Sequence, residues 1–247
     1  MRRFPAFAKI AGLVLAGSLA MGAAGATWYM FSAPAVHRLA LPADLVDASS
    51  ASGRALLANA IAKTDYEQLV PEFVVQERPT FCGVASGVAV INAILHPQPR
   101  LTQLTLFSPE AAAVRSELAV TFVGLTLDQL AQLIQAHGLR VETRHVSQSS
   151  LEAFRGLVRT TLAEPKAFVL VNYDRRRLGQ EGTGHISPLA AYNSERDVVL
   201  ILDVAAYKYP YTWVPLTKLW DAIATKDPMS GQTRGYLVVS AGQLASH

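Results

Sequence analysis

The sequence of 247 residues contains a single cysteine, Cys82. One thiol excludes an intramolecular disulfide, and it excludes the zinc and iron–sulfur sites that are built from several cysteines. A chain without disulfides is usual in the cytosol, but it also suits an exported protein that keeps one thiol free. Cys82 is therefore either an inert packing residue, which is the common case for a lone cysteine, or a group with chemistry of its own.

The sequence also has little excess charge of either sign. The formal net charge is +3, but the first 31 residues contain three of the 22 basic residues and no acidic residue. The remaining chain carries 19 basic and 19 acidic residues and is neutral. No run of basic residues is interleaved with aromatic residues, so the sequence argues against nucleic acid as a partner.

The one long uncharged run lies at the N-terminus. Residues 10–31 are 22 uncharged residues, enough to span a bilayer, and they follow a basic flank. That flank is expected to stay in the cytoplasm, which places the rest of the chain outside it, in the periplasm or anchored to the inner membrane. Small residues at 24–26 and 33–35 resemble cleavage sites, so a removed signal peptide and a retained anchor both stay open. A buried core helix is a third alternative.

Composition divides the chain into an N-terminal segment (1–31), a weakly patterned tether (32–50) and a domain (51–247). Hydrophobic residues make up 51% of the sequence, which is typical of a globular protein. Within the domain, hydrophobic periodicity and capping boxes at Thr126–Gln129 and Ser149–Glu152 predict helices. These helices are expected at 52–63, 83–95, 127–137, 149–163 and 216–225. Short β-branched runs predict strands at 166–173, 198–203 and 235–240. A helical first half and a strand-rich second half predict an α+β fold.

Cys82 stands in the stretch QERPTFCGVASGVAVINAIL, residues 76–95. Pro79 disfavours helix for the residue before it, and the apolar spacing after Gly83 predicts a helix that begins near the thiol. A cysteine at a helix N-terminus is favoured as a thiolate, because unpaired N–H groups and the helix dipole stabilise negative charge there. Gln76 can offer its amide N–H groups to an oxyanion, with the backbone N–H of Cys82 as a second donor.

Of the six histidines, His185 has the most informative setting. It follows a glycine-flanked loop and begins an apolar stretch, whereas the others are interpreted as surface or capping residues: His37, His96, His137, His145 and His247. Asp203 closes the apolar run 198–203, where it is either a turn residue or a partner of His185. A hairpin of 186–192 with 198–203 would bring the two side chains together, and the carboxylate could then orient the imidazole. Glutamine, cysteine, histidine and aspartate follow one another here in the order of roles found in papain-type enzymes.

Three separated stretches resemble the phytochelatin synthase family in the same order: residues 76–95, NYDRRRLGQEGTGHISPLAAYN (172–193) and VLILDVAAYKYPYTWVPLTKLWDAI (199–223). The resemblance runs from about residue 65 to 240. It implies a papain-like fold with Cys82 as nucleophile, His185 as base, Asp203 as the group that orients it and Gln76 in the oxyanion hole. It also places a set of residues around the substrate: Asn172, Tyr173, Arg175, Gly184, Asp227, Arg234 and Tyr236.

The family cleaves the Cys–Gly bond of glutathione, holds γ-glutamylcysteine as a thioester and passes it to a second glutathione or to water. The resemblance thus implies glutathione as the substrate, no covalently bound cofactor, no metal ligands in the protein, and cadmium or zinc as thiolate complexes of glutathione. The charges suit this substrate, because Arg175 and Arg234 can bind carboxylates and Asp227 can bind the ammonium group. Arg176 and Arg177 are interpreted as solvated surface charges.

Plant members of the family add a cysteine-rich C-terminal region, and this sequence has no second cysteine. It is similar in this respect to the short bacterial members, which favours hydrolysis of glutathione over polymer synthesis. The sequence sets no oligomeric state and leaves a homodimer open. The N-terminal run makes the membrane a partner if it is not cleaved.

Two other functions compete with this one. Leader peptidases of bacteriocin exporters also place glutamine before Cys-Gly and use a later Gly-His and Asp, but they follow that Asp with proline, where Val204 stands here. The second is a membrane-tethered module that binds thiols or metal without turnover. In such a module Cys82, His185 and Asp203 would ligate zinc, a less common ligand set than several cysteines.

Overall fold

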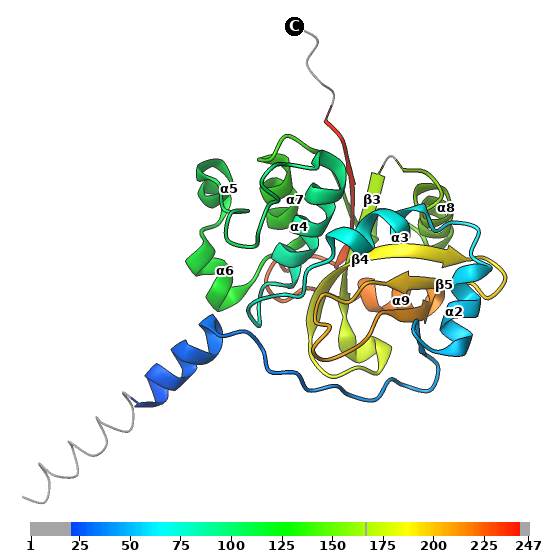
Figure 1. Cartoon of the computed structure of the whole chain (residues 1–247), viewed down its shortest axis with the longest axis horizontal. Helices are drawn as coiled ribbons and strands as arrows, with labels where there is room; N and C mark the ends of the chain where they lie inside the picture. Colours follow the sequence, from blue (N-terminus) through cyan, green and yellow to red (C-terminus); the bar gives the residue numbers. More distant parts are fainter. Residues whose placement is uncertain (1–20, 166, 243–247) are drawn as a thin grey trace, which may run out of the picture.

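The computed structural model describes residues 21–165 and 167–242 (Figure 1). Its strands are β1 (Val46–Asp47), β2 (Arg140–His145), β3 (Ala167–Asp174), β4 (Gly184–Asn193), β5 (Val198–Ile201), β6 (Thr212–Pro215) and β7 (Gly235–Ser240). Its α-helices are α2 (Ala51–Ala58), α3 (Thr64–Leu69), α4 (Cys82–Leu95), α5 (Pro109–Val114), α6 (Glu117–Val123), α7 (Leu127–Gln135), α8 (Leu151–Thr161) and α9 (Leu216–Ile223). The described residues also form three short 3₁₀ turns, at Val70–Glu72, Val146–Gln148 and Arg175–Leu178.

The strands form one seven-stranded sheet in the order β1-β6-β5-β4-β3-β7-β2. Every neighbouring pair is antiparallel. Most of the helices precede β3, so the predicted α+β class is confirmed. Strand β4 lies between β5 and β3, and its antiparallel pairing with β5 corresponds to the predicted hairpin.

Helices cover both faces of the sheet, and each face has its own hydrophobic core. On one face α4 and α7 pack against the sheet, and on the other face α8 and α9 do so (Figure 1). Strand β3 shows the reason, because its side chains alternate between faces. Leu170 belongs to the core under α4, whereas Val169 and Val171 belong to the core under α8 and α9.

Strand β2 was not expected from the sequence, and His145 at its end was interpreted as a surface residue. The strand pairs with β7 at the edge of the sheet, and its polar, half-exposed residues carry no clear alternation of apolar side chains. His145 is buried, because its ring bonds the carbonyl of Thr233 at 2.6 Å and the carboxylate of Asp128 at 3.1 Å. The strand escaped prediction because an edge strand with a single partner needs little hydrophobic patterning. The burial of His145 escaped it because the contacts with Thr233 and Asp128 join residues that are distant in sequence.

Two predicted helix boundaries are shifted by tertiary contacts. The predicted helix 52–63 ends at Ala58, because Ala62 leaves it to accept a hydrogen bond from the N–H of Tyr192 in β4 at 2.7 Å. The predicted cap at Ser149 falls on Ser150, which accepts from the N–H of Ala153, while the Ser149 hydroxyl bonds the hydroxyl of Tyr236. The capping box at Thr126 is present with both of its bonds.

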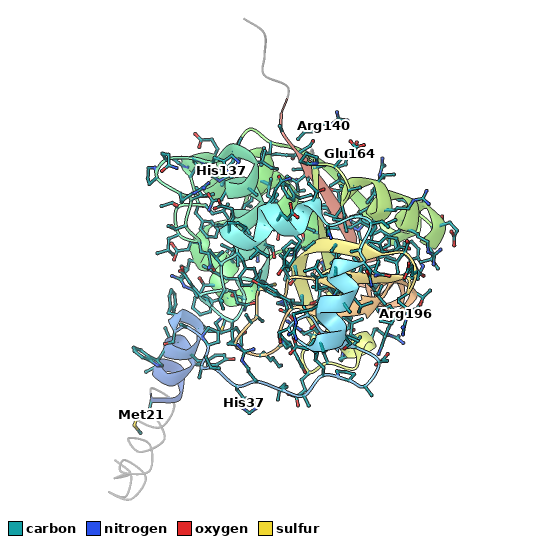
Figure 2. The ribbon with its side chains drawn as sticks, turned by 45° about the vertical axis from the view of Figure 1, so that its right-hand side comes forward. Met21, His37, His137, Arg140, Glu164 and Arg196 are labelled. Atoms are coloured by element: carbon teal, nitrogen blue, oxygen red, sulfur yellow. The ribbon has the colours of Figure 1, made fainter. Side chains whose placement is uncertain are left out.

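The N-terminal run is only partly described, because residues 1–20 lie outside the described residues, as does His247. Residues 21–31 are helical and lead away from the domain, with Met21 at the far end (Figure 2). In the described part of the chain, no helix is both long and apolar enough to cross a membrane. The segment predicted as a tether is pinned to the domain, since His37 and Leu39 donate to backbone carbonyls of residues 207 and 208 and β1 pairs with β6.

Candidate active site

Helix α4 presents Cys82 as its first residue. The helix is buried on nearly all sides, and the hydroxyl of Ser86 donates to the carbonyl of Ile186 in β4 at 3.1 Å. Phe81, the residue before the helix, is fully buried. These contacts fix the start of α4 against the start of β4, so the thiol lies beside the strand that carries His185.

The hairpin predicted from the sequence is present. Strands β4 and β5 pair with Leu189 opposite Ile201, and the N–H of Leu202 still reaches the carbonyl of Pro188. Asp203 follows directly and accepts a hydrogen bond on Oδ1 from Nε2 of His185 at 2.9 Å. Because Nε2 is held by the carboxylate, Nδ1 is the ring nitrogen left to face the sulfur of Cys82.

The electrostatics favour a charged thiolate–imidazolium pair. Burial raises the pKa of the Cys82 thiol, but the charge of His185 and a hydrogen bond from it outweigh burial, and the pKa lies below its ordinary value. Burial and the charge of Arg175 lower the pKa of His185, while Asp203 and Cys82 raise it, and the net pKa lies above the ordinary value. The two shifts agree in direction, since each charge stabilises the other.

Asp203 is held as a carboxylate. Burial favours its neutral form, but the charges of Arg175 and His185 hold its pKa well below the usual range. Oxygen Oδ1 also accepts from Nη2 of Arg175 at 2.7 Å and from the N–H of Ala205 at 2.9 Å. An ionised carboxylate whose Oδ1 is held by three donors can fix the orientation of the imidazole and stabilise its charged form.

A cavity of about 470 Å³ opens beside Cys82 and His185. Its apolar side includes Val123, Leu125 and Met229. Its polar side is lined by four of the residues that the resemblance places around the substrate: Asn172, Gly184, Asp227 and Arg234. The thiol therefore faces a space lined by both apolar and charged residues, which suits a small polar molecule.

The polar wall is a connected set of side chains. Nη1 of Arg234 donates to Oδ1 of Asn172 at 2.6 Å and lies 3.8 Å from a carboxylate oxygen of Asp227. The amide of Asn172 in turn lies 3.4 Å from that oxygen. Nε of Arg234 is buried without a hydrogen-bond partner. The wall thus carries a cation and a carboxylate that form an ion pair, and the amide of Asn172 forms hydrogen bonds with both.

Three residues predicted around the substrate do not line this cavity: Tyr173, Arg175 and Tyr236. Tyr173 is fully buried, with its ring edge-on to His185 at 5.6 Å between centroids. The Arg175 guanidinium is held behind the histidine by Asp203 and by Oε1 of Gln180 at 2.8 Å. Tyr236 lies in a different depression beside Ser149. These three support the site from behind, because strand and turn geometry direct them away from the cavity.

Gln76 is buried, and its amide has a partner already. Nε2 donates to the carbonyls of Arg78 and Pro79, both at 2.9 Å, so its two hydrogens hold the loop before Cys82. Its Oε1 is buried without a partner. The donation of this amide to an oxyanion stays a prediction, and in this structure the side chain shapes the approach to the helix instead.

Arg176 was not expected at the site, yet it lines the cavity. The 3₁₀ turn after β3 sends Arg175 inward and leaves Arg176 and Arg177 exposed. Asp174 accepts hydrogen bonds from the side chain of Arg176 and directs it toward the cavity mouth. The sequence of three consecutive arginines does not indicate which of them is buried, because the geometry of the turn decides the direction of each side chain.

Comparisons with known proteins identify the family of this chain. Residues 36–236 match the family model described as phytochelatin synthase. Glutathione gamma-glutamylcysteinyltransferase 3 of Lotus japonicus and glutathione gamma-glutamylcysteinyltransferase 1 of Arabidopsis thaliana are each 34% identical over 212 residues, covering 83% of this chain and 44% of the relative. The glutathione gamma-glutamylcysteinyltransferase of Schizosaccharomyces pombe is 28% identical over 209 residues, 82% of this chain and 50% of that protein. The chain spans about half the length of the curated relatives it matches, and it belongs to the phytochelatin synthase family.

Proposed function

We propose that the protein cleaves the Cys–Gly peptide bond of glutathione through a γ-glutamylcysteinyl thioester on Cys82. The observation that carries the proposal is the alignment of Cys82, His185 and Asp203 at one end of a cavity whose other wall is charged. Relatives over most of this chain bear the name glutathione gamma-glutamylcysteinyltransferase. An antiparallel sheet with a nucleophile at the start of a central helix also supports a papain-like fold.

The first half-reaction uses the charged pair. The thiolate of Cys82 attacks the carbonyl carbon of the cysteinyl residue of glutathione, and the electrons of the C=O bond move to the oxygen. The imidazolium of His185 then gives its proton to the glycine nitrogen, the C–N bond breaks, and glycine leaves with an intact amino group. N–H groups at the start of α4 point toward the developing oxyanion, as expected for a helix N-terminus.

The second half-reaction regenerates the thiolate. Neutral His185 takes a proton from the acceptor, which is water or the amino group of a second glutathione, as the acceptor attacks the thioester carbonyl. The C–S bond breaks, and the products are γ-glutamylcysteine or a chain longer by one γ-glutamylcysteine unit. Asp203 stays ionised throughout and holds Nε2 of the ring.

The charged wall suits the γ-glutamyl end of the substrate, which carries an ammonium and a carboxylate on one carbon. Asp227 can bind the ammonium, and Arg234 can bind the carboxylate through donors that include its unpartnered Nε. Recognition of both groups would fix the thiol-bearing residue of glutathione over Cys82, because the reacting carbonyl lies a fixed number of bonds away.

The competing functions fit the site less well. A leader peptidase needs an extended groove for a peptide, whereas the space beside Cys82 is a cavity with a charged wall. In a zinc-binding module Asp203 would face the metal, but its Oδ1 is occupied by His185, Arg175 and Ala205. Within residues 21–165 and 167–242, no group of three or more metal-ligating side chains is arranged to hold a metal ion.

Product analysis tests the proposal and its choice of acceptor. On incubation with glutathione we expect mainly glycine and γ-glutamylcysteine by mass spectrometry, with short oligomers at high glutathione concentration and with cadmium present. Water is present at roughly 55 M and competes with millimolar glutathione unless a second glutathione is held in attacking geometry. Polymers of three or more units as the first products would refute hydrolysis but keep the thioester. No glycine release at all would refute the proposed function.

The charged wall gives a prediction about binding. We expect Asp227→Asn to raise KM for glutathione on the order of 10-fold, a loss of about 1.4 kcal/mol, while kcat changes less, because the lost contact binds a group remote from the reacting bond. The matched control is Asp221→Asn on α9, since that aspartate is exposed and does not line the cavity. Steady-state kinetics on both variants decides, and equal KM values would remove Asp227 from the binding site.

The thiolate–imidazolium pair predicts the pH dependence of kcat/KM. The active form exists above the lowered pKa of Cys82 and below the raised pKa of His185, so we expect a bell whose acid limb lies below the ordinary pKa of a thiol. The rate of alkylation of Cys82 by iodoacetamide should follow the same acid limb, because only the thiolate reacts. An alkylation rate that rises only near pH 8.5, where a free thiol titrates, would contradict the charged pair.

A further inference from the structure

Exposed apolar side chains gather where α6 meets the helix of residues 21–31. Leu118 and Phe122 lie four residues apart on one face of α6, and they are 58% and 49% exposed. Val123 follows at the end of the helix, and Met229 lies next to the adjoining Gly124. With two aromatic residues of the N-terminal helix they form what we call the α6 patch: Trp28, Phe31, Leu118, Phe122, Val123 and Met229. Scattered exposed apolar residues are normal, but a contiguous group marks a contact surface.

The N-terminal helix is attached to this patch. The ring of Phe31 lies edge-on to Phe122 with 5.8 Å between centroids, and the guanidinium of Arg78 covers Phe31 at 4.8 Å. Arg78 pairs with Glu117 at 2.7 Å, so these two charges at the junction neutralise each other. Figure 1 shows the helix leading away from the domain at α6. The α6 patch therefore surrounds the point where the helix of residues 21–31 leaves the domain.

The chain that leaves the patch has the composition of a lipid-embedded segment. Residues 10–31 carry no charge, and basic residues precede them. Trp28 and Tyr29, near the end of that run, are 76% and 62% exposed. Tryptophan and tyrosine favour the interface between lipid and water, where their apolar rings and polar groups are both accommodated. This places the level of a bilayer surface at the α6 patch.

We propose that the α6 patch rests on a lipid bilayer into which the uncharged N-terminal segment inserts. The domain is then not free on its tether but seated on the membrane. Val123 and Met229 belong both to the patch and to the lining of the cavity, so the mouth of the active site lies at the membrane surface. The proposal also requires that the N-terminal segment is retained. Cleavage at 33–35 would remove Phe31 from its contact with Phe122, and cleavage at 24–26 would remove most of the uncharged run.

Spin labelling of the full chain tests this seat. In a Cys82→Ser background, Phe122→Cys carries a nitroxide label, and the protein is reconstituted in vesicles of phosphatidylcholine and phosphatidylglycerol. The matched control is Ile61→Cys, an apolar position that is 60% exposed and follows α2. Helix α2 lies across the molecule from α6 in Figure 1. Collision rates with oxygen, which concentrates in lipid, and with a water-soluble nickel chelate report the surroundings of each label.

We expect a ratio of oxygen to nickel collisions severalfold higher at position 122 than at position 61. Equal ratios would show that the patch faces water and would overturn the proposal. Protection of position 122 from both reagents would show that protein covers it, either a partner or a second copy, and would overturn it too. Leu118→Cys, which leaves the Phe31–Phe122 contact intact, repeats the measurement if Phe122→Cys does not fold. All variants lack the thiol, so the result is independent of the proposed function.

Discussion

We expect the Cys82→Ser variant to lose glycine release from glutathione by a factor on the order of 10⁴ or more, with its fold intact. The serine hydroxyl is a far weaker nucleophile than the thiolate that His185 stabilises here, and it forms no thioester. The side chain is only partly buried and nearly isosteric, so the substitution disturbs packing little. Glycine release measured at saturating glutathione, beside far-UV circular dichroism and thermal unfolding, checks both halves of the expectation.

The same experiment on His185 shows whether the two residues act as a unit. We expect His185→Ala to lose nearly as much activity as Cys82→Ser, and the double variant to lose little more than either, because members of a catalytic unit are strongly non-additive. Asp203→Asn should lose less, since it orients the ring rather than reacting. A folded Cys82→Ser protein that still releases glycine at the parent rate would exclude the thiol mechanism.

Local sequence signals predicted the start of α4 at Cys82 and the approach of His185 to Asp203. Pro79 and the apolar spacing after it indicated a helix that starts at the thiol, and α4 begins at Cys82 itself. The hairpin between β4 and β5 follows from two apolar runs around a polar turn, and it fixes the distance between His185 and Asp203. Both features depend on neighbours in sequence, where periodicity and turn chemistry are informative.

The rest of the site depends on contacts that no local pattern encodes. Arg234 approaches Asn172 across 62 positions of sequence, and Arg176 reaches the cavity mouth only because a turn directs Arg175 inward. The resemblance to a family predicts Arg175 and Tyr173 as substrate contacts, whereas in this structure Arg175 bonds Asp203 and Tyr173 packs against His185. The sequence thus indicated that Arg175 and Tyr173 lie near His185. It did not indicate that their side chains lie outside the cavity lining.

We expect Arg175 to contribute to the free energy of unfolding through its buried ion pair with Asp203. Its side chain is nearly fully buried and forms a 2.7 Å ion pair with the equally buried Asp203. Removing one partner of a buried pair leaves an uncompensated charge, which typically costs 3–5 kcal/mol. Because Asp203 keeps the hydrogen bond from His185, we expect Arg175→Met to lower the free energy of unfolding by about 3 kcal/mol, the low end of that range.

The matched control is Arg177→Met, two residues further along the same turn and exposed to solvent, which should change the free energy of unfolding by no more than about 0.5 kcal/mol. Urea unfolding followed by circular dichroism measures both variants. Adding Asp203→Asn to Arg175→Met should recover part of the loss, because no charge is then left buried without its partner. Equal costs for Arg175→Met and Arg177→Met would show that the buried pair does not stabilise the fold.

The pH dependence of that cost separates an ion pair from simple packing. In the parent protein the folded pKa of Asp203 is depressed, so its contribution is complete above the unfolded value of about 3.9 and is lost as the pH falls below it. Without Arg175, burial acts on Asp203 with less opposition, its folded pKa rises, and acid no longer removes that contribution. We therefore expect the difference in stability between parent and Arg175→Met to shrink as the pH falls below the unfolded value, where the parent loses the contribution of Asp203. A difference independent of pH would assign the cost to lost packing of the arginine side chain, since packing does not titrate.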